Sequence, residues 1–149
     1  MPILHYPVII GTLLFKLWTV AAWLILPTHW QDYAAKYVHT VELVDRDSRF
    51  NGTTGVYSST WINAGAERTR DQLIWYACSM VHEARHGEQL ELLPMPFWYW
   101  GVYGEIDAIR HQRQCLVDLG ADPGQTEWLD YLVEEYRASH IDPSEPHDY

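Results

Sequence analysis

Residues 79–89 read SMVHEARHGEQ, with two histidines four residues apart and a glutamate directly after the first histidine. On a helix, side chains four residues apart lie on one face, about 6 Å apart along the axis, so His82 and His86 can direct ring nitrogens at one cation. Glu83 can then reach a water molecule in an open coordination position and accept its proton. The H-E-x-x-H spacing therefore predicts zinc ligands at His82 and His86 and a catalytic base at Glu83.

A third ligand is expected from the helix that follows. Residues 104–108 read GEIDA, and Glu105 stands at the opening of a predicted helix. Ala108 lies one turn after Glu105, and a small side chain there lets the two helices approach closely enough for the carboxylate to reach the metal. The predicted metal ligands are thus His82, His86 and Glu105.

At these residues the chain resembles the gluzincin zinc metallopeptidases, the thermolysin-like class whose third ligand is a glutamate on a following helix. The resemblance covers residues 82–86 and 105–108. It implies a Zn²⁺-dependent hydrolase that cleaves peptide or protein substrates with Glu83 as general base, and a substrate-binding edge strand that residues 56–62 could supply. The run WYACSMVHEARH (75–86), together with LGA (119–121), is also similar to small bacterial proteins without an established activity.

The chain departs from the thermolysin-like pattern in two ways. Such enzymes place an aspartate one turn after the glutamate ligand to orient the first histidine, and Ile109 stands there in this chain. Asp107, Gln112 or a backbone carbonyl could orient the histidines instead. We also expect no downstream domain of the kind that supplies the residue stabilising the transition state in that class, which leaves four local candidates: Tyr57, Tyr99, Tyr103 and His111. The position of His111 on its helix favours a packing or surface role over a metal ligand.

Two other interpretations of the motif stay open. In the first, the domain is a non-catalytic metal-binding relative that serves in partner recognition, which the missing aspartate motivates. In the second, the helix is purely structural, with solvated histidines and with Glu105 placed favourably near its own helix N-terminus.

The pattern of the whole chain predicts an α+β fold, and the resemblance implies a small zincin-like domain. Residues 38–44 and 56–63 alternate like strands, and Asn51-Gly52 and Gly55 between them favour positive φ, so we expect a β-hairpin or a small sheet. Helical periodicity predicts helices over 67–93, 103–121 and 126–140. The expected organisation is an apolar segment over 1–27 and one metallopeptidase-like domain over 28–149.

Residues 7–26 form a 20-residue apolar stretch with a single charge, Lys16. That length suits a membrane-spanning helix. Lys16 lies on one helical stripe with Thr12 and Thr19, so a packed amphipathic helix or a cleaved signal peptide are the alternatives. We expect membrane association through residues 7–26, or an extracytoplasmic location.

Composition narrows the class of partners. The formal net charge of −10 repels phosphate backbones, so nucleic acid is not an expected partner. With only two cysteines, Cys78 and Cys115, the chain is no disulfide scaffold or four-cysteine zinc module. Two free buried thiols are the default expectation, and a disulfide between the two motif helices is the alternative.

Overall fold

The computed structural model of the chain describes residues 8–44, 54–58, 70–92 and 97–138. Within them lie five helices and three short strands, an α+β composition dominated by helices, as predicted. In chain order these are β1 (Val8–Ile10), α1 (Leu13–Ile25), α2 (Thr28–Tyr37), β2 (Thr40–Val44), β3 (Thr54–Ser58), α4 (Arg70–Leu92), α5 (Phe97–Asp118) and α6 (Pro123–Arg137).

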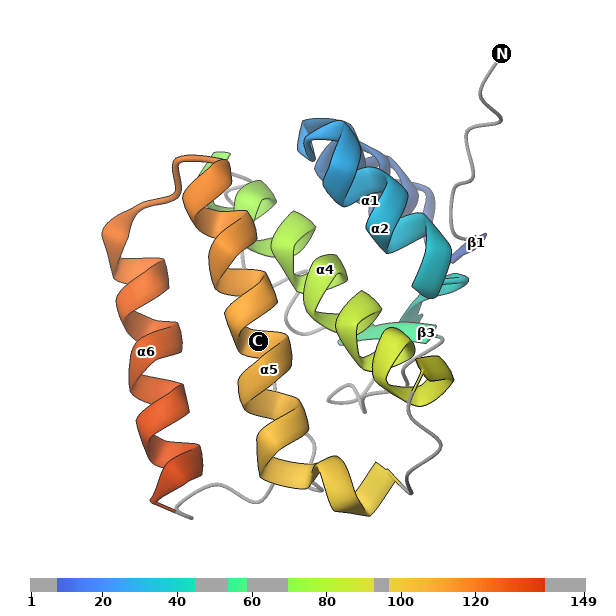
Figure 1. Cartoon of the computed structure of the whole chain (residues 1–149). Coiled ribbons are helices and arrows are strands. Elements are labelled where there is room, and N and C mark those ends of the chain that lie inside the picture. Colours follow the sequence, from blue (N-terminus) through green and yellow to red (C-terminus); the bar gives the residue numbers. More distant parts are fainter. Residues whose placement is uncertain (1–7, 45–53, 59–69, 93–96, 139–149) are drawn as a thin grey trace.

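Helix α4 is the centre of the structure. It packs against α1 and α2 on one side and against α5 on another, and α6 lies against the far side of α5 (Figure 1). The buried residues of all five helices and of β2 form one apolar cluster, which includes Phe15, Ala34, Met80, Leu116 and Leu129. The helix that carries the histidine motif is therefore covered on several sides, and its inward residues lie away from water.

The predicted β-hairpin is wrong, and the strands form the small sheet that was the alternative. β1, β2 and β3 form a three-stranded sheet in that order, and both strand pairs are parallel. Gly55, expected in the turn, lies inside β3 and pairs with Val41 of β2. Glycine and asparagine show only where positive φ is tolerated, and they do not determine which way the next strand runs. Residues 59–63 of the predicted second strand lie outside the described residues.

The apolar stretch over residues 7–26 does not form one continuous helix. Val8–Ile10 is a strand paired with β2, and α1 begins only after Thr12, whose side chain accepts a hydrogen bond from the backbone N–H of Phe15. Among the described residues, no helix has the length and apolar character to cross a membrane. The inner face of α1 packs on α4, the helix that carries the histidine motif, and belongs to the same apolar core. Lys16 on α1 is exposed.

The helix boundaries differ from the predicted ones at both ends of α5, which ends at Asp118 instead of residue 121, and at the start of α6. Helix α5 begins at Phe97 instead of residue 103, and its backbone is non-helical at Gly101 (φ 18°, ψ −112°), so the first turn is set at an angle to the rest. Helix α6 begins at Pro123, where the sequence predicted a start at Thr126. Proline is well suited to the first helical position because its missing N–H would lack a partner there, and the Asp122 side chain accepts from the N–H of Gly124.

Candidate metal centre

His82, His86 and Glu105 lie together in the interior. The two histidines stand one turn apart on α4, and Glu105 faces them from α5, just past the kink at Gly101. Their side chains are only 1%, 1% and 2% exposed. Gly104 and Ala108 beside the glutamate are buried as well, and such small residues let α5 approach α4. The structure thus brings together the three residues named as ligands, and the metal itself stays a prediction.

One nitrogen of each histidine and one oxygen of Glu105 lie within 4.8 Å of one another, close enough to share one ion. His86 Nε2 lies 3.1 Å from His82 Nε2 and 2.7 Å from Glu105 Oε1, and His82 Nε2 lies 3.6 Å from Glu105 Oε2. Zinc bonds of about 2.0–2.1 Å at tetrahedral angles place ligand atoms about 3.3 Å apart. The contacts in the protein lie on both sides of that value and involve both oxygens of Glu105, so binding of zinc through one of these oxygens requires the side chains to adjust.

The tautomer of His86 follows from its neighbour Gln89. The Gln89 Nε2 group donates to the Gly104 carbonyl oxygen at 3.1 Å and to Asp107 Oδ2 at 2.9 Å. Both partners only accept, so the amide orientation is fixed and Gln89 Oε1 is the atom that lies 3.0 Å from His86 Nδ1. The His86 Nδ1 atom therefore carries the hydrogen, and in the neutral ring Nε2 presents a lone pair to Glu105.

Gln112 contacts His82 from α5. Its Oε1 lies 3.0 Å from His82 Nδ1, and in this orientation of the amide Nδ1 is the donor and His82 Nε2 keeps a lone pair. Two ring lone pairs and a carboxylate oxygen then converge without a hydrogen between them when both rings are neutral. Such a group of acceptors requires a cation, which is either a proton on one ring or a metal ion.

The charges around Glu105 favour its ionised form. Burial opposes ionisation, but the electrostatic effect of His86 and hydrogen bonds from His82 and His86 outweigh it and hold the pKa of Glu105 well below its usual value. In this state a proton on one ring faces the ionised carboxylate. A metal ion in place of that proton would meet two ring lone pairs and one carboxylate, a donor set that suits Zn²⁺.

Glu83 differs from every other acid near the cluster. Burial, together with the charge of Glu105, raises the pKa of Glu83 well above its usual value. Its Oε2 atom is buried and has no hydrogen-bond partner among the described residues. A buried acceptor of this kind is rare in folded proteins unless a water or ligand completes it. Glu83 is therefore suited to contact a molecule held beside the cluster.

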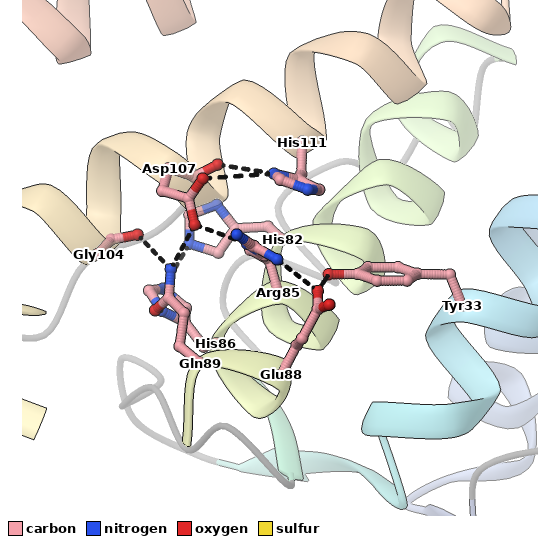
Figure 2. Close-up of polar contacts among 9 residues, drawn as sticks. All are labelled: Tyr33, His82, Arg85, His86, Glu88, Gln89, Gly104, Asp107 and His111. Atoms are coloured by element: carbon pink, nitrogen blue, oxygen red, sulfur yellow. Dashed lines mark hydrogen bonds and ion pairs between the residues drawn. The ribbon is translucent and has the colours of Figure 1, made fainter. Parts of the chain in front are cut away.

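A chain of polar contacts surrounds the cluster and ties it to α2 (Figure 2). Arg85, between the two histidines of the motif, donates to Asp107 Oδ2 and to Glu88 Oε2, each at 2.6 Å. The hydroxyl of Tyr33 on α2 also donates to Glu88 Oε2. Asp107 in turn fixes Gln89, so the contacts run from α2 through α4 and α5 to His86.

A disulfide joins Cys78 on α4 to Cys115 on α5, with a Cα–Cα distance of 5.5 Å. The default expectation of two free thiols is wrong, although both residues are fully buried as expected. Cys78 lies one turn before His82, and Cys115 lies one turn after Gln112. The bond therefore links the two helices directly beside the contact that orients His82.

The candidates for orienting the histidines differ in whether they contact a histidine ring directly. Gln112 contacts His82 directly, whereas Asp107 acts at one remove, through Gln89. Ile109, at the position of the missing aspartate, is fully buried in the core. The sequence reasoning missed Gln89, although its spacing of three residues from His86 places it on the same helical face.

The structure gives little support to the four candidates for stabilising a transition state. Tyr103 is 76% exposed. His111 stacks on the ring of Tyr33 and contacts the backbone oxygen of Asp107, as its packing role predicted. The side chains of Tyr57 and Tyr99 lie outside the described residues.

Comparison of the chain with protein-family models, with curated proteins and with solved structures found no match in any of the three.

Proposed function

We propose that the protein is a zinc-dependent hydrolase that cleaves peptide bonds, with His82, His86 and Glu105 as the metal ligands. The observation that carries this proposal is the convergence of two ring nitrogens and an ionised carboxylate from two helices, close enough to share one ion. Three protein ligands leave a fourth position for water or substrate, which is the pattern of a catalytic zinc site.

Glu83 would supply the acid–base chemistry. A zinc ion held by the cluster would lower the pKa of a bound water and polarise the carbonyl of the scissile bond. Glu83 removes a proton from the attacking water and passes it to the leaving amine nitrogen as the bond breaks. Burial and the charge of Glu105 raise the pKa of its carboxyl, which makes Glu83 a stronger base than an exposed carboxylate.

A zincin-like arrangement would place the substrate beside β3. This strand contacts α4 and lies at the end of the strand order β1-β2-β3. An extended peptide can add to a sheet edge through backbone hydrogen bonds. Residues 56–62 remain our candidate for this edge, and only its first part, to Ser58, lies within the described residues.

The variant Glu83→Gln tests the catalytic half of the proposal. The amide keeps the size of the side chain and leaves all three ligands in place, so zinc content should not change, while hydrolysis of a peptide library should fall by at least about 100-fold. Glu91→Gln is the matched control, because Glu91 is an exposed glutamate on the same helix. Equal hydrolysis by wild type and Glu83→Gln would contradict the peptidase proposal.

The alternative function is metal binding without catalysis, in a protein that serves partner recognition. Neutral amides stand behind both histidines, where a carboxylate would make the rings stronger ligands. In this alternative the cluster binds zinc with full occupancy, while neither wild type nor Glu83→Gln hydrolyses any peptide of the library.

We also propose that the protein works in an oxidising compartment outside the cytoplasm. The Cys78–Cys115 bond is the observation in favour, because cytosolic proteins keep such thiols reduced.

A further inference from the structure

Helix α1 is apolar on both its faces, although only one face is covered. Phe15 and Ala22 of the inner face are fully buried against the core. The outer face carries a row of exposed apolar side chains, with β1 contributing two more beside the helix start. These residues are Val8, Ile10, Leu13, Leu14, Leu17, Val20 and Leu24. Leu13, Leu17 and Leu24 are 73%, 59% and 62% exposed.

Such a face is unusual in a helix that packs on only one side. Surface helices place charged and polar residues opposite the buried face, and a helix that is apolar all round is normally enclosed. Leu13, Leu17, Val20 and Leu24 follow one another at spacings of three and four residues, so they form a single continuous strip. A contiguous apolar surface of this kind marks a contact with something outside the folded domain.

The charges along this part of the chain indicate which kind of surface the outer face of α1 contacts. The chain carries a net charge of −10, yet residues 1–31 contain no aspartate or glutamate. Lys16, exposed on α1, has no ion pair among the described residues. An apolar strip flanked by a lysine, without acidic neighbours, complements a lipid surface, where leucines enter the acyl boundary and the ammonium group reaches the headgroups.

A second copy of the chain fits this face less well. The strip from Leu13 to Leu24 is about 17 Å long and one helix wide, which is much smaller than the roughly 800 Å² that each partner buries in a stable interface. A two-fold contact through the strip would also bring Lys16 near its own symmetry mate, without an acidic partner in either strip.

We propose that the outer face of α1 docks in the plane of a lipid bilayer, with its leucines in the acyl boundary and Lys16 at the headgroups. The domain is then held at the membrane surface without a spanning helix. This inference is independent of the proposed zinc site, because it rests on none of the residues that surround that site.

Flotation of the full chain with vesicles tests this inference. The wild type should float with vesicles of phosphatidylcholine, and more strongly when phosphatidylglycerol is included. Leu17→Glu should lower the partition coefficient about tenfold or more on both vesicles, since one buried leucine contributes that much to membrane transfer. Val117→Glu on α5 is the matched control, because Val117 is 52% exposed and should leave flotation unchanged.

Two more variants keep the result interpretable. Leu24→Gln introduces no charge and should weaken flotation in the same direction, so the effect does not depend on repulsion by a new glutamate. Lys16→Gln should remove only the additional binding to phosphatidylglycerol. A wild type that stays with the unbound protein on both vesicles would overturn the inference. So would a dimer that forms without lipid and is lost in Leu17→Glu, as measured by sedimentation velocity.

Discussion

Gln112 on α5 places its Oε1 atom 3.0 Å from Nδ1 of His82 on α4, and its own Nε2 group has no hydrogen-bond partner among the described residues. In this orientation the amide accepts from His82 Nδ1 and turns the lone pair of His82 Nε2 towards Glu105. This contact is the one that would orient His82 in the proposed metal site.

The strength of this contact should set the affinity of the proposed metal site. Gln112→Glu replaces the amide with a stronger acceptor and loses no hydrogen bond, so zinc should bind more tightly. Gln112→Leu removes the acceptor, and affinity should fall about 10- to 100-fold. Competition with a chelator of known affinity measures both changes. Gln114→Leu, an exposed glutamine on the same helix, is the control, and identical affinities in all these variants would contradict the orienting role.

The contact between α2 and α4 should contribute measurably to stability. Tyr33→Phe removes the hydroxyl that donates to Glu88, and a hydrogen bond to a charged group of this kind is worth about 1–2 kcal/mol. Urea denaturation should show that loss in the free energy of unfolding. Tyr131→Phe is the control, because Tyr131 on α6 is half exposed, and an equal loss in both variants would argue against the Tyr33–Glu88 contact.

The Cys78–Cys115 bond should stabilise both the fold and the metal site. The two cysteines are 37 residues apart, and closing a loop of that length in the unfolded chain corresponds to about 4 kcal/mol at most in the chain-entropy model. The double variant Cys78→Ala/Cys115→Ala should lose about 2–4 kcal/mol of unfolding free energy and bind zinc more weakly. Thiol counting in unfolded wild-type protein should find no free thiol, and two free thiols would contradict the bond.

Local spacing was enough to predict the residues of the candidate site. The four-residue separation of His82 and His86 indicates one helical face, and a glutamate followed by a small residue indicated how Glu105 could reach it. Both indications depend on helix geometry alone, which is why they carried over into three dimensions. The residues that contact the rings of His82 and His86 could not be ranked from spacing. Gln112 and Gln89 reach the rings through side chains whose directions depend on how α4 and α5 pack.

Contacts between residues far apart in the sequence were left open or predicted wrongly. The alternation correctly indicated strands at residues 40–44 and 56–58, and residues 59–63 lie outside the described residues. Pairing direction depends on the path of the chain between the strands, and the strands are parallel. The pairing of Cys78 with Cys115 likewise depends on the register of two helices. The apolar stretch over 7–26 divided into β1 and α1 because Val8–Ile10 pairs with β2.

Zinc binding by purified protein tests the central claim most directly. After removal of bound metal and titration with Zn²⁺ in a buffer without chelating components, the wild type should bind about one ion per chain, and Glu105→Gln should bind much more weakly because it lacks the charged ligand. His39→Ala, at an exposed histidine outside the cluster, should bind like the wild type. A wild type that takes up less than about half an equivalent would contradict the metal site and leave His82, His86 and Glu105 as a buried ion pair that shares a proton.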